Sequence, residues 1–330
     1  MSDAVLEYNR IDLLKSKRIQ VLRGLAICAV VMIHTNAGGL RGVLIRPHIN
    51  FCVALFIFLS GYLTKLDYPD WGAFFKRRIL KVLIPYIQWT VVYALLNRRP
   101  EAIWKYLLTG KAAAPLYFIL VYIQFVLLTP LISRLLRSDF QWMGWLITPI
   151  TVILTRYLFP TLGYEVGFPF PGTVCLPWFQ FYYFGLSCGN RQLDSERGKR
   201  SPSNIYIYIF YILAVALSTI EGLFWYRIGN YDLATTQIRL SSLGASLYAC
   251  FIAAEYIRPN AERQLGTIER SFAAIGDYSF EIMLSHILIM RILKHFVPTI
   301  MRFPMGLLTI IGSYCFAYIV SISRTKMPRK

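Results

Sequence analysis

The chain has 330 residues, of which 56% are hydrophobic and only 16% are charged, and its mean hydropathy is +0.49. Soluble domains carry about 25% charged residues, so this composition argues against a soluble fold. The formal net charge of +18 would suit a nucleic-acid-binding protein. No basic motif with interleaved aromatic residues occurs outside the apolar stretches, however, and basic residues that flank membrane spans account for the charge. We therefore expect an integral membrane protein that binds no nucleic acid.

Long apolar stretches, separated by short polar connections, run through the chain from its first helix to its last. A membrane-spanning helix needs roughly 17–25 mostly apolar residues. We therefore predict an all-α, polytopic integral membrane bundle of about ten transmembrane helices, in which the second and third spans are short. The predicted spans are 20–39, 49–64, 82–97, 113–132, 141–158, 174–189, 204–226, 236–256, 272–293 and 305–322.

The basic residues predict how these spans are oriented. Lys and Arg in the segments assigned to the cytoplasm outnumber those outside by about two to one, which favours an even number of spans with both termini cytoplasmic. Residues 1–19 begin polar and lack a small-residue cleavage site, so we expect a cytoplasmic segment and not a cleaved signal peptide. We expect one membrane domain over 20–322 and a basic cytoplasmic tail over 323–330. The 98–112 connection is basic although it is assigned outside, and WKYLL at 104–108 suggests an interfacial helix there.

Two ionisable residues lie in the first span, whose central sequence is RGLAICAVVMIH. Arg23 and His34 are eleven positions apart, which places them on nearly the same helix face and about 16 Å apart along the axis. Ionisable residues within a membrane are costly and are typical of functional sites. Arg23 would lie near the inner interface, where an arginine can also extend to lipid phosphates. His34 would lie in the outer half, where it needs a partner and can titrate.

The later spans also carry polar candidates. His286 should lie in the outer half of its span, as either a functional histidine or a structural one bonded to a neighbouring helix. Asp277 and Glu281 share a helix face at i, i+4 spacing, and they could form a buried ion pair with Arg239. Another carboxylate, Glu221, lies four residues before Trp225 and could contact a sugar. The sequence leaves the roles of these residues open.

Six stretches stand out in chain order: RGLAICAVVMIH (23–34), FIFLSGY (56–62), KRRILKVLIPY (76–86), LYFILVYIQFVLLTP (116–130), FYYFGLSCG (181–189) and IGDYSFEIMLSHILI (275–289). In this order they resemble the signature motifs of the membrane acyltransferase-3 family. The resemblance covers most of the chain, and the two histidine motifs are its most specific part. Three positions depart from the family pattern: Lys81 replaces a usual arginine, Met283 a common tyrosine, and Glu281 a small residue. The chain carries no added hydrolase-like domain, so we expect a standalone integral-membrane O-acyltransferase.

The resemblance implies the transfer of an acyl group, usually acetyl, from cytoplasmic acyl-CoA to a hydroxyl of an extracytoplasmic or lipid-linked glycan. Such polysaccharide modification implies a multi-pass location in the bacterial inner membrane. Acyl-CoA would be a donor substrate and not a permanently bound cofactor. We expect no metal site, and we expect contacts with membrane lipid. The sequence does not identify the acceptor glycan, and it does not distinguish acetyl from succinyl or another acyl group. It also leaves the oligomeric state open, and a homo-oligomer is compatible with it.

The residues then acquire expected roles. His34 would be the general base that removes the acceptor's proton, with a covalent acyl-histidine as a variant, and His286 would orient the acceptor or assist proton transfer. Ser60 would donate a hydrogen bond to the donor or serve helix packing beside Gly61. The donor's phosphates would be held by the basic residues assigned to the inner side, which are Arg23, Arg77, Arg78 and Lys81.

A proton-coupled transporter or flippase of a glycan or small solute is the main alternative. Arg23, His34 and His286 would then line a path for protons or substrate. Such transporters commonly contain paired broken helices in two matching halves, and the sequence shows no such symmetry. A sensor or scaffold is a third class, but it would need no row of polar residues within the membrane.

Overall fold

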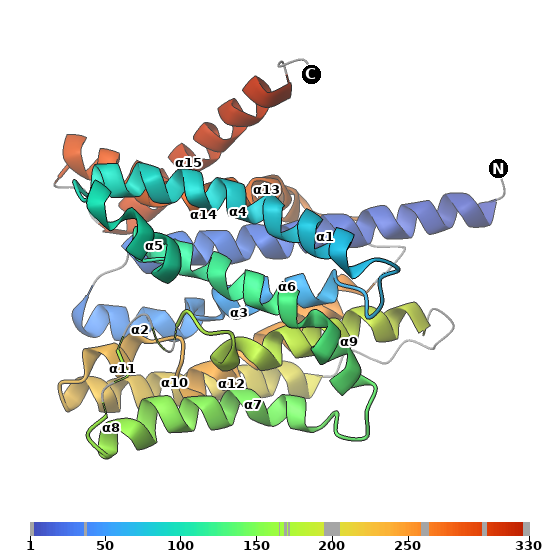
Figure 1. The fold of residues 1–330 in the computed structure, drawn as a ribbon, viewed down its shortest axis with the longest axis horizontal. Coiled ribbons are helices and arrows are strands. Elements are labelled where there is room, and N and C mark those ends of the chain that lie inside the picture. The colour runs from blue at the N-terminus through green and yellow to red at the C-terminus, as the bar shows by residue number, and fades with distance from the viewer. Residues whose placement is uncertain are drawn as a thin grey trace. The chain divides into compact units, whose positions relative to one another are not determined.

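The computed structural model describes most of the chain, and the regular structure in the described segments is helical. These segments contain no strand, which confirms the predicted all-α class. Figure 1 shows the helices in chain order. The described residues are 3–35, 38–164, 166–167, 170, 172–194, 205–258, 264–298 and 302–325.

The chain forms two compact units, and each is assembled from segments that are distant in the sequence. The first unit comprises Met1–Phe56, Ser203–Thr236 and Gly244–Lys330. Its helices are α1 (Asp3–Thr35), α2 (Gly39–Ile49), the first part of α3 (Phe51–Tyr62), α10 (Ile205–Arg227), α11 (Tyr231–Thr235), most of α12 (Leu240–Ile257), α13 (Thr267–Asp277), α14 (Ser279–Phe296) and α15 (Arg302–Thr325).

The second unit comprises Ile57–Pro202 and Gln237–Leu243. Its longer helices are the rest of α3, α4 (Trp71–Leu96), α5 (Ile103–Thr109), α6 (Tyr117–Leu136), α7 (Met143–Val152) and α9 (Phe179–Asp194). Short elements complete it: three 3-10 turns at Pro100–Ala102, Ala114–Leu116 and Leu176–Trp178, a π-helix at Ile153–Leu158, and α8 (Phe159–Thr161).

Helices lie at all ten predicted places, but fewer meet the length and apolarity of a membrane span. In the described residues seven do so, and an eighth is α13 with α14 if this pair, bent by 78°, is one broken span. The predicted spans 141–158 and 174–189 fall short because α7 has ten residues before its π-helix and α9 has sixteen. A multi-pass membrane protein is therefore supported, whereas the number ten stays a prediction.

The second and third spans are longer than the sequence suggests. Gly39–Tyr62 provides 24 residues and Trp71–Leu96 provides 26. The third begins early because the Asp70 side chain caps α4, accepting a hydrogen bond of 3.1 Å from the Ala73 amide. The expected helix at 104–108 is confirmed as α5, on which Trp104 and Leu108 are 78% and 81% exposed. Its place at a membrane interface stays a prediction.

Hydrogen bonds within the first unit join segments that the predicted topology assigns to the same side. The Arg18 guanidinium donates to the carbonyl oxygens of Tyr256 and Arg258, so the start of the first span meets the end of the eighth. The Asn50 side-chain amide donates to the Thr236 carbonyl at 3.2 Å. This bond joins the start of the second span to the start of the eighth, and the predicted topology assigns both to the outer side. Both bonds agree with alternating helix directions.

The second unit shows the same agreement. Arg137, after α6, forms a bidentate ion pair with Asp67, after α3, and its hydrogen bonds hold the pKa of Asp67 below the ordinary value. The Asn190 side chain in α9 donates to the Thr64 carbonyl at 3.0 Å and accepts from the Leu66 amide at 3.1 Å. Three connections assigned to one side of the membrane therefore meet at one end of this unit.

Glycines allow backbone-to-backbone contact between helices in both units. A Cβ atom at Gly24 in α1 would lie 1.9 Å from the Phe272 carbonyl oxygen in α13. A Cβ at Gly276 in α13 would lie 1.9 Å from the Gln20 carbonyl oxygen in α1. Small residues at such positions let membrane helices approach closely. The pair Gly24 and Gly276 therefore fixes α1 against α13.

We expect Gly24→Ala to destabilise the protein by at least about 1–3 kcal/mol, because backbone cannot move aside as a side-chain tip can. The measurement is the melting temperature of the detergent-purified protein, followed by size-exclusion chromatography. Gly244→Ala in α12 is the matched control, since no atom lies within 4 Å of its new Cβ. Equal melting temperatures for the two variants would contradict the packing described here.

Candidate active site

The structure brings two of the predicted site residues together in the first unit. His34 lies in the last turn of α1 and His286 lies in α14. Their ring centroids are 5.3 Å apart and the ring planes are tilted by 36°. His286 is completely buried, and His34 is half-buried. Two imidazoles in contact inside an apolar helix bundle form a site that can accept and pass protons.

The tautomer of neutral His286 follows from its backbone contact. Its Nδ1 atom lies 3.0 Å from the Ile282 carbonyl oxygen, one turn earlier in α14. A carbonyl oxygen can only accept a hydrogen bond, so Nδ1 carries the hydrogen and Nε2 has the lone pair. Nε2 is buried and has no hydrogen-bond partner in the part of the chain that the structure describes. The ring thus presents an unused acceptor next to His34.

Buried hydroxyl groups occur on the helices that meet at this pair. Ser285 precedes His286, and Thr35 follows His34. In α15, Thr309 donates to the Met305 carbonyl at 2.7 Å, whereas the buried Ser313 hydroxyl has no partner among the described residues. Buried polar atoms are usually hydrogen-bonded, but both units contain buried side-chain atoms that lack a partner among the described residues.

Arg46 is a residue that the sequence analysis did not select. It lies in the last turn of α2, is half-buried, and its charge acts on His34. The segment 40–48 lies between the predicted spans 20–39 and 49–64, and an arginine in such a connection does not by itself indicate a site. The available signal was an arginine that follows the apolar run Val43–Ile45 and directly precedes Pro47. Arg46 supplies a positive charge to the histidine site.

Arg23 lies in the same unit and on the same helix as His34. Because α1 is unbroken from Asp3 to Thr35 (Figure 1), the spacing of about 16 Å along the axis applies. The half-buried guanidinium donates to the Gln20 side-chain oxygen at 3.4 Å, and its charge acts on Asp277 in α13. Arg23 is therefore held within a polar group on one face of α1.

The other predicted donor-binding residues belong to the second unit. Ser60 is half-buried in α3, and its carbonyl oxygen accepts a bond of 2.7 Å from the Thr64 hydroxyl. Arg77 and Lys81 are exposed on α4. Their role in binding phosphate stays a prediction.

Arg78 has structural contacts that the sequence did not reveal. Its guanidinium donates to the Leu63 carbonyl at 3.0 Å and to the Tyr122 hydroxyl at 3.5 Å. It also lies over the Phe74 ring, 5.7 Å from the centroid. The residue therefore joins α4 to the end of α3 and to α6, which leaves fewer donors for a ligand than an exposed arginine has.

The prediction that Asp277 and Glu281 share one helix face is wrong. Helix α13 ends at Asp277 and α14 begins at Ser279, with a bend of 78° between them, so i, i+4 geometry does not apply. Glu221 does contact Trp225, whose indole nitrogen donates to the carboxylate at 3.1 Å. A sugar contact there stays a prediction.

Comparisons with known proteins identify one family. The acyltransferase-3 family model, described as an acyltransferase domain, matches residues 16–323. No curated protein and no solved structure matches the chain significantly. The matched range includes every residue placed in the candidate site above.

Substitutions at the neighbouring residues Ser60 and Gly61 can distinguish a role in helix packing from a role in ligand binding. A Cβ at Gly61 would lie 2.3 Å from the Tyr182 carbonyl oxygen in α9. We therefore expect Gly61→Ala to lower the melting temperature strongly, whereas Ser60→Ala should change the unfolding free energy by no more than about 0.5 kcal/mol. Thermal melts of the two neighbouring variants in the same detergent make the comparison. A larger loss for Ser60→Ala would show that its hydroxyl, and not Gly61, holds the two helices.

Proposed function

The chain belongs to the membrane acyltransferase-3 family, and on this premise we propose that it transfers an acyl group, usually acetyl, from cytoplasmic acyl-CoA to a hydroxyl of an extracytoplasmic or lipid-linked glycan. The membrane-length helices support a multi-pass location, and we propose the bacterial inner membrane. The family does not favour the transporter alternative.

The observation that carries the proposed mechanism is the contact between His34 and His286. The acceptor hydroxyl oxygen attacks the thioester carbonyl carbon, and His34 removes the hydroxyl proton as the new C–O bond forms. The C–S bond then breaks, the acyl group remains on the acceptor oxygen, and the proton is returned to the leaving CoA sulfur. No covalent enzyme intermediate is required, although an acyl-histidine is the chemical variant of this scheme.

His286 supports this step through its fixed tautomer. Its Nδ1–H is used by the Ile282 carbonyl, so Nε2 can only accept. We propose that this lone pair receives a hydrogen bond from the His34 ring or from the acceptor hydroxyl. A base whose neighbour is held in one tautomer starts each turnover in the same protonation state.

Charged residues complete the proposed machinery. Arg46 acts on His34 and would stabilise the negative charge that develops on the thioester oxygen. Arg23 remains a proposed phosphate ligand of the donor. In the second unit, taken by itself, Arg77, Arg78 and Lys81 remain proposed phosphate ligands, with Ser60 as a proposed hydrogen-bond donor. Arg78 would contribute less because Leu63 and Tyr122 already use its guanidinium.

We expect His34→Ala to lower kcat by about 10²–10⁴-fold, since positioned general bases contribute rate factors of that size. The measurement is transfer of labelled acetyl from acetyl-CoA to envelope glycan extract by the purified protein, with mass spectrometry to detect the added acetyl. His295→Ala, at an exposed histidine in the same unit, is the control and should keep full activity. Glycan flux without acylation in the wild type would contradict the proposal.

Two variants of His286 separate a chemical role from a structural one. An asparagine amide can still donate to the Ile282 carbonyl in place of Nδ1, but it has no group at Nε2. We therefore expect His286→Asn to fold normally and to lose kcat by at least about tenfold, because the missing acceptor belongs to the reaction. A normal rate and pH profile for His286→Asn would assign the residue to helix structure alone.

A further inference from the structure

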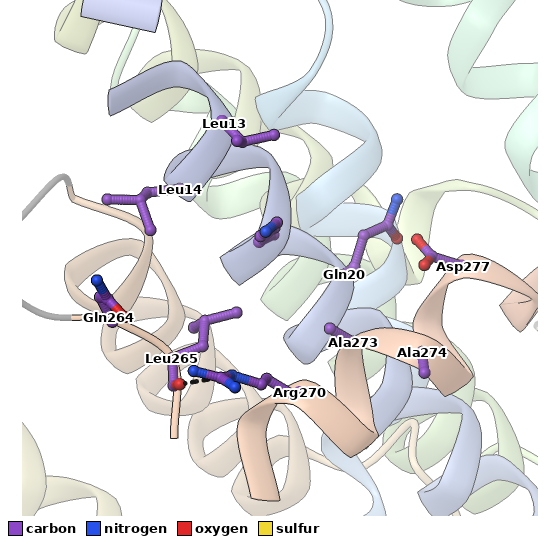
Figure 2. Close-up of a pocket in the computed structure, with 10 residues that line it drawn as sticks. Leu13, Leu14, Gln20, Gln264, Leu265, Arg270, Ala273, Ala274 and Asp277 are labelled. Carbon is purple, nitrogen blue, oxygen red and sulfur yellow. Dashed lines mark hydrogen bonds between the residues drawn. The ribbon is translucent and has the colours of Figure 1, made fainter. Parts of the chain in front are cut away.

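A pocket of about 540 Å³ lies in the first unit, away from the histidine pair. One wall is the N-terminal part of α1, and the other is α13 with the two residues Gln264 and Leu265 that precede its N-cap Gly266. Its volume is within the range of roughly 300–1,000 Å³ that small-molecule pockets occupy. Figure 2 shows its lining residues.

Two cations, Lys17 and Arg270, line this pocket. Lys17 is exposed, and in the described part of the chain no carboxylate lies within ion-pair distance of it or of Arg270. The Arg270 Nε atom donates to the Leu265 carbonyl at 3.0 Å, the bond drawn in Figure 2. That bond orients the guanidinium and leaves its terminal N–H groups available. An oriented guanidinium beside an ammonium group suits a phosphate, which accepts bidentate hydrogen bonds.

The rest of the pocket lining provides hydrogen-bond acceptors and apolar side chains. Gln20 and Asp277 point toward each other in Figure 2, and Gln20 also accepts a hydrogen bond from Arg23. These oxygens can accept from an N–H or O–H group of a ligand. Leu13 and Leu14 add an apolar surface. The pocket thus offers cations, acceptors and apolar contact to one molecule.

We propose that this pocket binds a phosphate-bearing small molecule, with the phosphate held by Lys17 and Arg270 and an N–H or O–H donor of the ligand bonded to Asp277 or Gln20. Two sources carry that chemistry: a nucleotide and the headgroup of a phospholipid. A nucleotide would extend the proposed function, since it would be the end of the acyl-CoA donor, whereas a lipid headgroup would be independent of it.

The test measures binding to the purified full chain by titration calorimetry with two probes. Adenosine 3′,5′-bisphosphate represents the nucleotide, and soluble dihexanoyl phosphatidylglycerol represents the lipid. Adenosine and dihexanoylglycerol, which lack phosphate, are the reference probes. We expect one phosphate probe to bind with a Kd that rises with salt, and its reference probe to bind at least tenfold more weakly.

We expect the double variant Lys17→Gln/Arg270→Gln to weaken that binding by about 10–100-fold, because each lost charge-assisted hydrogen bond costs about tenfold. Arg227→Gln/Lys294→Gln, at two exposed cations of the same unit, is the matched control and should bind as the wild type does. Ala274→Leu narrows the pocket without removing charge and should also weaken binding, which covers the case that the double variant fails to fold.

Equal affinities of the wild type and both pocket variants, or no binding of either phosphate probe, would overturn the proposal. His34→Ala lies outside the pocket and should bind the probe normally. Loss of acyl transfer in that variant together with intact binding separates the two proposals, because each can then fail without the other.

Discussion

The contact between the backbones of α1 and α13 is the constraint on which the first unit depends. At Gly24 and Gly276 each helix fills the space that a side chain of the other would need, so neither helix can rotate or slide without a clash. Arg23 and Gln20 lie beside this contact, and Asp277 follows it. Because α1 is a single rigid helix, fixing it at Gly24 also sets the direction in which His34 is presented. One pair of glycines thereby positions both the candidate active site and the pocket.

The histidine pair is polar in a place where polarity is costly. Burying an unsatisfied hydrogen-bonding group generally costs about 1–3 kcal/mol, and the His286 Nε2 atom is such a group among the described residues. An apolar residue of similar size would avoid that cost. A site that departs from the rules of stable packing is expected where function requires it. The proposed acyl transfer to a hydroxyl would explain this cost, because that reaction needs a base.

The second unit is organised around α9, whose aromatic and glycine residues have separate tasks. Gly185 and Gly189 let α9 reach the carbonyl oxygens of Phe58 and Tyr62 in α3, where added Cβ atoms would lie 2.1 Å away. The aromatic side stacks Tyr182 on Phe125 of α6 at 4.7 Å, and the Tyr182 hydroxyl is bonded to Thr129 at 2.8 Å. The sequence FYYFGLSCG therefore encodes two helix contacts, one through absent side chains and one through large ones.

The sequence by itself determined the all-α class, the places of the helices and the family, because apolar runs and the order of motifs are local properties of the chain. It also identified Arg23, His34 and His286 as exceptional, since ionisable residues in apolar stretches stand out without a structure. Tertiary structure alone decided that the two histidines touch and that Arg46 acts on His34. It also decided that Arg78 is engaged with Leu63 and that a bend separates Asp277 from Glu281. These outcomes depend on contacts between residues far apart in the chain, and on a helix break at Tyr278 that hydrophobic periodicity does not register.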